Sequence, residues 1–354
     1  MTARLPSPKF DHGYRRLTLR AGRLWIPVRA RSLTVGLVFS MAILLLGILS
    51  LGLGTYQLSP AQVLQTFLQG GESLDRTVVL QWRLPRTLAA VFLGVLLGMA
   101  GAVFQTVTRN PLASPDILGL SNGAFTGMLL SIVFVSSSWP VMTAGAVTGG
   151  LLTALVIWML AQRGGVQGFR LIVIGIGVAA MLASANTWML LEVELETAMF
   201  ASAWGAGTLN GVTAVPLAGA MLSAIPLALL LLALAPRLRQ LDLGDDAATS
   251  TGARPGTART LSLLIAVGLV SLATAVIGPV AFIALAAPQI ARRVAATPYL
   301  SLILSGLLGG FLLLGSDLIA QHILPGAVPV GVVTVTVGGL YLVTTIIQEI
   351  RRRA

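Results

Sequence analysis

The chain has 354 residues, of which 56% are hydrophobic and only 10% carry a charge. A soluble domain of this size would carry about 25% charged residues, so the composition excludes a water-soluble globule and predicts a membrane-embedded protein. The absence of cysteine excludes disulfides, thiolate nucleophiles and cysteine metal sites. The net charge of +11 indicates orientation in a membrane rather than nucleic-acid binding, because the basic residues cluster beside the ends of apolar runs.

Ten apolar segments are each long enough to cross a bilayer, which takes about 20 residues of helix. The first of them follows a basic segment, residues 1–32, that we expect to lie in the cytoplasm. Residues 33–350 are expected to form a single transmembrane domain of the all-α polytopic class. The predicted spans are 33–54, 87–107, 113–135, 140–161, 170–190, 213–235, 260–278, 279–297, 300–321 and 330–349.

The distribution of basic residues supports an even number of spans. Alternation from a cytoplasmic N-terminus places twenty basic residues on the inner side and only Arg76, Arg83 and Arg86 on the outer side. Such asymmetry is typical of the positive-inside orientation. An odd number of spans would put Arg351 to Arg353 outside, so we predict a multi-pass protein of the cell membrane with both termini in the cytoplasm.

Three joints between spans are longer than a turn. In the outer joint 55–86, Ser59 can cap a short surface helix that begins at Pro60. The outer joint 191–212 carries three glutamates and is expected to be a solvated loop. The inner joint, about 236–259, mixes acidic and basic side chains and is the candidate coupling loop.

The sequence lacks the residues that would supply energy or bond chemistry. It has no GxxxxGK[ST] phosphate loop, and its only lysine is Lys9. The two histidines, His12 and His322, stand alone, so no metal site is predicted. Asp317 is the one clear acidic candidate within a span. It is either a structural residue hydrogen-bonded near a helix end or the titrating group of an ion-gradient-driven carrier.

Several segments together resemble the iron–siderophore and vitamin B12 family of ABC importer permeases. They are "RLPRTLAAVFLGVLLGMAGAVFQTVTRNPLASPDILGLSNGAFTG" (83–127), "LDLGDDAATSTGA" (241–253), "GPVAFIALAAPQIARR" (278–293) and "DLIAQHILPGAVPVGVVTVTVGGLYL" (317–342). The resemblance extends from about residue 33 to 350. The "PQIARR" and "YL" variants are nearer the ferric siderophore permeases, whereas Gln289, Gln321 and Ala327 depart from the family's usual residues.

The resemblance implies a type II importer architecture with ten helices in each permease subunit. It also implies a second permease, two ATPase subunits that bind ATP and magnesium, and an extracytoplasmic binding protein. A heterodimer of permeases is favoured over a homodimer. The chain would be a non-enzymatic subunit with no cofactor of its own, and it would import a ferric siderophore. The alternative is a secondary transporter that uses Asp317.

The resemblance also assigns candidate sites. Arg83 and Arg86 would face acidic residues of the binding protein, although arginines at a helix end can equally be membrane anchors. A short helix with a small-residue face would contact the ATPase, unless this joint is only a solvated loop. The coupling residues are Leu243, Gly244, Asp245, Asp246, Ala247, Ala248, Thr249, Thr251 and Gly252.

Two further candidate sites each have a structural and a functional explanation. Asn110 and Pro111 are expected to turn the chain at the cytoplasmic face, because proline breaks the helix and asparagine can cap the next one. An ATPase contact is the other explanation of this turn. Met181, Ser184 and Asn186 lie in a span of small and flexible residues and would line the translocation path. Ordinary helix packing explains the same composition.

Overall fold

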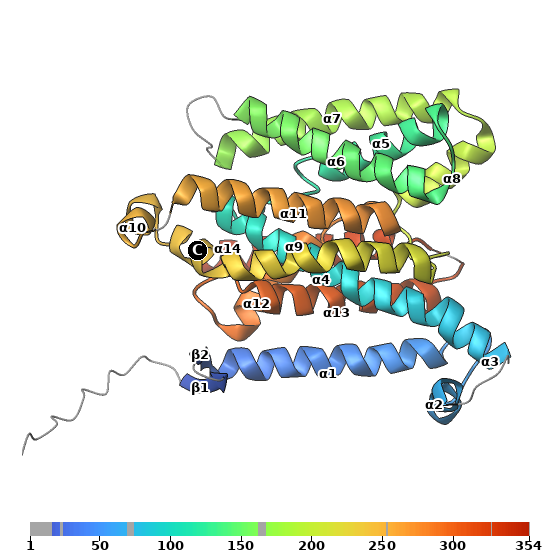
Figure 1. The fold of residues 1–354 in the computed structure, drawn as a ribbon, viewed down its shortest axis with the longest axis horizontal. Helices are drawn as coiled ribbons and strands as arrows, with labels where there is room; N and C mark the ends of the chain where they lie inside the picture. The colour runs from blue at the N-terminus through green and yellow to red at the C-terminus, as the bar shows by residue number, and fades with distance from the viewer. Residues whose placement is uncertain are drawn as a thin grey trace, which may run out of the picture.

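The computed structural model describes residues 16–21, 24–68, 74–161, 168–252, 254–326 and 328–353. Its long helices lie roughly side by side in one bundle (Figure 1). A helix occurs at each of the ten predicted spans: α1 (Ala30–Gly52), α4 (Leu84–Thr108), α5 (Leu120–Phe134), α6 (Trp139–Ala161), α7 (Gly168–Glu192), α9 (Ala214–Leu241), α11 (Pro255–Ile277), α12 (Ile283–Ala295), α13 (Leu302–His322) and α14 (Val330–Arg353).

The predicted all-helical membrane fold is confirmed. Among the described residues, seven helices are long and apolar enough to cross a membrane, and α5 and residues Val330–Thr344 of α14 are shorter apolar helices. A small antiparallel hairpin of β1 (Arg16–Ala21) and β2 (Leu24–Arg29) precedes α1. Residues 1–15, 22 and 23 of the predicted cytoplasmic segment lie outside the described residues, as do Arg163 and Ala327.

Two predicted spans are shorter than expected. The span at 113–135 is helical only from Leu120, because Pro115 and the left-handed Gly119 (φ 76°) interrupt the preceding segment. The span at 279–297 reduces to α12, whose 13 residues rise about 20 Å. This is less than the roughly 30 Å of a bilayer core, so α12 alone does not cross it. Left-handed residues at Phe282 and Ala296 bound this helix.

The joints between helices gather at the two ends of the bundle in the predicted alternation. We call these the α10 end, after α10 (Asp245–Ser250), and the α3 end, after α3 (Leu74–Arg76); they are opposite each other in Figure 1. At the α10 end Arg31 donates to Val294 O (2.9 Å) and Arg109 donates to Leu241 O (3.3 Å). At the α3 end, residues from 50–56, 78–86 and 320–322 line one cavity together with Asn210, Gly326 and Val328.

The joints at the α3 end contain more helix than the sequence indicated. The predicted surface helix is α2 (Pro60–Leu68), and Ser59 and Gln62 form a reciprocal capping box at its start. The π-helix η1 (Thr77–Arg83) runs directly into α4. The joint expected to be a solvated loop contains α8 (Leu195–Gly205), whose Trp204 is buried and stacks on Phe125. Its glutamates are exposed, as expected.

Glycines allow two helix pairs to approach at backbone distance. A Cβ atom added to Gly94, Gly98 or Gly309 would overlap backbone atoms of the facing helix in the α4–α13 pair. The same holds for Gly127 and Gly145 in the α5–α6 pair. Lipid gives no hydrophobic drive for helix pairing, so such small-residue contacts determine which helices pack closely.

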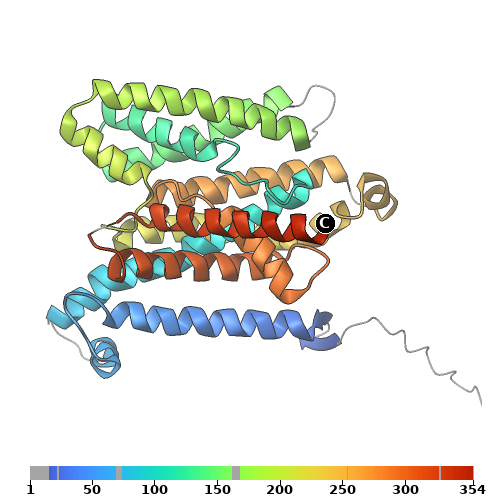
Figure 2. The same cartoon turned by 180° about the vertical axis from the view of Figure 1, so that it is seen from behind.

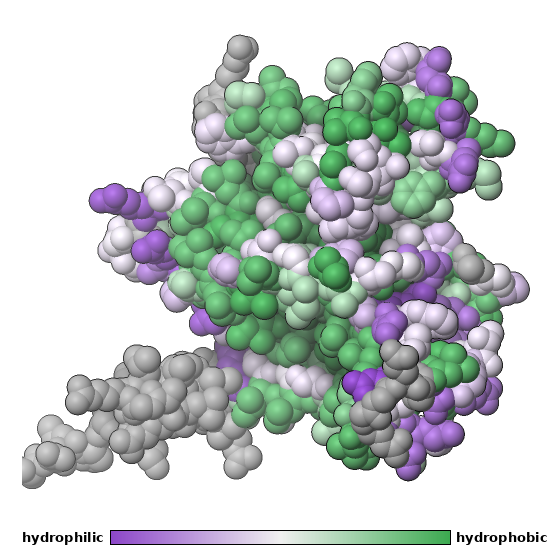
Figure 3. Space-filling model, turned by 45° about the vertical axis from the view of Figure 1, so that its right-hand side comes forward, coloured by the Kyte–Doolittle hydropathy of each residue, from purple (hydrophilic) through white to green (hydrophobic). Residues whose placement is uncertain are grey.

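The surface of the bundle is apolar across its middle. Figure 3 shows hydrophobic side chains over the centre of one face and polar ones toward the ends. Leu222 and Leu229 on α9 are 78% and 61% exposed, as expected for a helix in contact with lipid or another subunit. α9 lies on the near face in Figure 1, and α14 lies on the near face in Figure 2, so the two occupy opposite faces.

Candidate functional site

A polar cavity of about 410 Å³ opens at the α3 end of the bundle. The last residues of α1, η1 and the start of α4, and the last turn of α13 form its walls. Both arginines expected to dock a partner, Arg83 and Arg86, line it, together with Asn210, Gln321 and His322. The structure thus brings together polar residues that are more than 200 positions apart in the sequence.

Arg86 forms an ion pair with Asp317, the lone acidic residue noted in the ninth span. Arg86 Nη2 lies 2.7 Å from Asp317 Oδ1, and Arg86 Nε donates to Oδ2 at 3.0 Å. Gln321 Nε2 donates to the same Oδ2 (2.6 Å), and Arg86 Nη1 also donates to Asn210 Oδ1. The Asp317 side chain is fully buried. This arrangement fits the structural interpretation of Asp317, because its charge is balanced by a bidentate guanidinium.

Arg83 has a different environment, formed by backbone oxygens. Its guanidinium donates to the carbonyls of Leu51 (2.8 Å), Gly52 (3.2 Å) and Tyr56. These acceptors include carbonyls at the C-terminus of α1, where a positive charge is favoured. Nearby, the hydrogen bond from the Tyr56 hydroxyl to Asp75 raises the pKa of Tyr56. Arg83 therefore joins α1 to α4, but no carboxylate balances its charge among the described residues.

The predicted coupling loop forms the short helix α10 at the opposite end. Gly244 (φ 105°) and Gly252 (φ 83°) bound it in backbone conformations that favour glycine. The loop residues are not equivalent: Leu243 is 68% exposed, whereas Ala248 is completely buried. Asp246, Thr249 and the remaining loop residues Ala247 and Thr251 are at least partly exposed.

Asp245 holds α10 to the bundle. Its carboxylate accepts from Arg109 Nη2 at the end of α4 (2.6 Å) and from Arg259 Nη2 on α11 (3.0 Å). The N-cap of α10 is Gly244, which has no side chain to cap the helix, so the Asp245 carboxylate serves these two ion pairs. Desolvation raises the pKa of the neighbouring Asp242, and Arg292 and Arg109 oppose that rise.

The chain turns after α4 at Asn110 and Pro111, but Asn110 does not cap the next helix, because α5 begins only at Leu120 after Gly119. Arg109 is left-handed (φ 51°), and the Asn110 side chain accepts from the Leu112 N–H (2.9 Å) within the turn that contains Pro111. The irregular segment that follows carries a half-buried acid, Asp116, which accepts a hydrogen bond from Ser121 Oγ (2.9 Å).

The three residues predicted to line a path lie on different faces of α7. Met181 is 74% exposed, and Ser184 is exposed beside it. Asn186 is only 3% exposed; it accepts from Thr126 Oγ1 (2.6 Å) and donates to Asn122 O (3.2 Å) on α5. The structure therefore groups Met181 with Ser184 and gives Asn186 a helix-packing contact.

No direct signal in the sequence predicted the Arg86–Asp317 pair or the position of Asn210. A charged residue within a membrane span usually has a partner, and this rule could have paired the lone Asp317 with an arginine near a helix end. Asp116 was missed in the same way, because it also lay within a predicted span, at 113–135.

Comparison with known proteins gives the family. The FecCD transport family matches residues 42–348. The chain belongs to this family. Among its relatives, ferric enterobactin transport system permease protein FepG of Escherichia coli is 43% identical, with coverage of 93% of this chain and all of FepG. FepD, a ferric enterobactin permease of the same organism, is 36% identical over 86% of this chain and 92% of its own length.

More distant proteins agree on the fold of this FecCD family member. The iron(3+)-hydroxamate import system permease protein FhuG of Bacillus subtilis is 32% identical over 88% of this chain and 96% of its own. A solved structure described as an inward-facing conformation of a metal-chelate type ABC transporter superposes with a TM-score of 0.79. It covers 89% of this chain and 99% of its own at 22% identity. The fold is therefore that of a type II importer permease.

Proposed function

We propose that this chain is one permease subunit of an ATP-driven importer of a ferric siderophore. The observation that carries the proposal is the 43% identity to a ferric enterobactin permease over that relative's whole length. The chain provides a path and a mechanical link and makes or breaks no bond. ATP and magnesium belong to partner ATPase subunits, and the second permease is a related but different chain, as the FepG and FepD relatives suggest.

The α10 end faces the cytoplasm in this proposal. The arginines of the inner joints lie at that end, as the positive-inside rule expects. Residues 33–350 act as one transmembrane domain, with the basic N-terminal segment and the C-terminus also in the cytoplasm. The α3 end then receives the binding protein that carries the siderophore.

The coupling contact with the ATPase is made by the exposed side of α10. Leu243 and Thr249 are available to a partner, and Ala248 packs against the bundle. Asp245 transmits movement of α10 because its ion pairs connect α10 to both α4 and α11. The Asn110–Pro111 turn lies beside this contact and acts mainly as a structural turn.

Arg83 and Arg86 have different roles in docking the binding protein at the α3 end. Arg83 supplies positive charge to the cavity, since its partners are neutral carbonyls. Arg86 is a positioning residue, because Asp317 already balances its charge. An acidic side chain of the binding protein is therefore expected to approach Arg83. Within the bundle, the exposed face of α7 with Met181 and Ser184 contributes to the path.

The test is ATP hydrolysis in liposomes that contain this chain, its candidate ATPase and the second permease. Loaded binding protein should stimulate hydrolysis in the wild type, and Leu243→Arg should abolish the stimulation. Leu112→Arg is the matched control, because Leu112 is 51% exposed in the 110–112 turn outside α10. It should retain the stimulation.

Two outcomes would count against the proposal. Siderophore uptake driven by an ion gradient with this chain alone would refute the importer function. Equal loss of stimulation in Leu243→Arg and Leu112→Arg, with both variants assembled, would refute the assignment of the coupling contact to α10.

A further inference from the structure

A second cavity, of about 270 Å³, lies at the α10 end between α9 and α11. Its lining contains two arginines from different segments, Arg237 near the end of α9 and Arg254 just before α11. Gly252, Thr257, Ala258 and Leu261 complete the lining. The proposed coupling contact uses neither arginine.

These two arginines differ from their neighbours in lacking a partner. Arg109 and Arg259 pair with Asp245, and Arg239 lies over the ring of Tyr299 at 4.5 Å. In the part of the chain that the structure describes, neither Arg237 nor Arg254 makes a hydrogen bond or ion pair. Both side chains are exposed. Two uncompensated positive charges around one cavity provide electrostatic complementarity to an anion.

The N-terminus of α11 adds backbone donors beside the same cavity, which Thr257 lines. α11 begins with Pro255, which has no N–H, and no side chain caps its first turn. The N–H groups of Gly256 and Thr257 belong to that first turn and have no partner within the helix. They supply the positive end of a 23-residue helix beside the arginines. Phosphate oxygens match this set of donors because Arg forks and helix N-termini both bind them.

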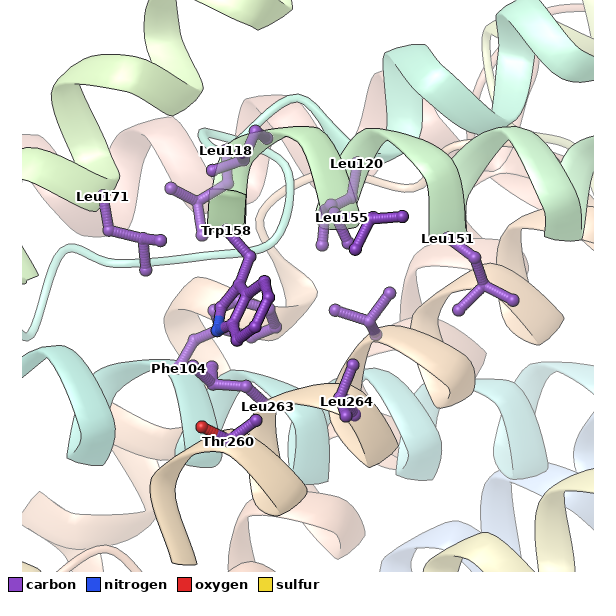
Figure 4. A pocket seen from close by; sticks show the side chains of 13 residues that line it. Phe104, Leu118, Leu120, Leu151, Leu155, Trp158, Leu171, Thr260, Leu263 and Leu264 are labelled. Atoms are coloured by element: carbon purple, nitrogen blue, oxygen red, sulfur yellow. The ribbon is translucent and has the colours of Figure 1, made fainter. Parts of the chain in front are cut away.

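An apolar cavity of about 220 Å³ lies further along α11. It is lined by Thr260, Leu263 and Leu264 of α11 and by Leu155 and Trp158 of α6, among other apolar residues (Figure 4). Leu264 is 56% exposed and stands seven residues after Thr257, so the two share one face of α11. An apolar chain attached to a phosphate at the first cavity can therefore follow α11 toward the second.

We infer that Arg237 and Arg254 bind the phosphate of an anionic phospholipid, one of whose acyl chains follows α11 to the apolar cavity. The inference rests on the proposed orientation, with the α10 end in the cytoplasmic leaflet. Basic pockets between transmembrane helices on that side are known recognition elements for anionic head groups. A free phosphate would satisfy the arginines but would leave the apolar cavity unused.

The experiment measures lipid retained by the full-length chain in detergent, by native mass spectrometry. The probes are dioleoyl phosphatidylglycerol and dioleoyl phosphatidylcholine, which have the same chains but different net charge. The wild type should retain phosphatidylglycerol preferentially. Arg237→Gln and Arg254→Gln should each weaken this retention about fivefold, since one arginine near a membrane surface contributes about 1 kcal/mol. Arg351→Gln removes the same charge outside the cavity and should have no effect.

Two further arms separate the sources of phosphate. Inorganic phosphate and glycerol 3-phosphate at millimolar concentration should not displace the lipid, because they lack acyl chains. Displacement by either would overturn the lipid assignment. Unchanged preference in the Arg237→Gln/Arg254→Gln double variant would overturn the site, as would an equal loss in Arg351→Gln. If the double variant kept its lipid preference but no longer assembled with the ATPase, the arginines would belong to a protein contact instead. Lipid retention needs no partner subunit, so this result is independent of the hydrolysis test.

Discussion

Alanine at Gly309 tests whether the backbone contact between α4 and α13 stabilises the bundle. A Cβ atom there would meet the carbonyl oxygen of Gly94 and would lie 3.1 Å from the Cα of Gly98. Both neighbours are backbone atoms, so α4 and α13 must move apart. Overpacking of this kind costs about 1–3 kcal/mol, whereas the gain in helix propensity from glycine to alanine is at most about 1 kcal/mol. Gly309→Ala should therefore lose about 1–2 kcal/mol net.

Gly315 in the same helix is the matched control. No atom lies within 4 Å of a Cβ built at this position, so Gly315→Ala makes the same chemical change without a clash. Thermal unfolding in detergent should show Gly309→Ala about 2–4 °C below the wild type. Gly315→Ala should unfold at the wild-type temperature or slightly above it. Equal shifts for the two variants, or an increase for Gly309→Ala, would refute the packing argument.

Three further predictions concern polar groups. Asp317→Asn should lower the free energy of unfolding by about 3–5 kcal/mol, because it leaves Arg86 without its carboxylate partner. Unfolding measurements should show that the double variant Arg86→Gln/Asp317→Asn recovers part of this loss. An unchanged free energy of unfolding in Asp317→Asn would contradict a stabilising role of the pair. Asn186→Ala should cost about 1 kcal/mol by removing interhelical hydrogen bonds. Thr187→Ala is the control, because the exposed Thr187 hydroxyl bonds only within α7. Transport by both variants should persist if Asn186 serves packing alone. The raised pKa of Asp242 means that the folded wild type is destabilised as pH rises through that pKa. Unfolding from pH 4 to 8 should therefore show Asp242→Asn more stable than wild type at neutral pH, with the difference closing toward the ordinary value of 3.8. A constant difference would exclude titration of Asp242 as its cause.

The positions of the helices could be predicted because each apolar run had to be long enough for a bilayer. Helix boundaries within those runs could not. Hydropathy does not distinguish the irregular segment before Leu120 from helix, although Pro115 and Gly119 signal an interruption. α12 likewise adjoins apolar residues that are not helical. The sequence analysis missed α8 because the glutamates of this joint predicted a solvated loop, and the buried Trp204 gave no opposing signal.

The short helix α10 was predictable from local features, because its joint combines acidic and small side chains. The internal partners of the site residues were not. Arg86 and Asp317 are 231 positions apart, and no periodicity relates them. The distinction between exposed Leu243 and buried Ala248 also depends on how α10 rests on α9 and α11, which a loop's composition does not specify.

The glycine-mediated contacts divide the bundle into mechanical units. In the α4–α13 and α5–α6 pairs, backbone atoms of the two helices face each other directly at Gly94, Gly98, Gly309, Gly127 and Gly145. Sliding within a pair would therefore force backbone collisions. A change from an outward to an inward opening would have to occur between these pairs, with each pair moving as one rigid body. The non-helical segments 109–119 and 278–282 are the natural places for such a division, since no continuous hydrogen-bonded helix crosses them.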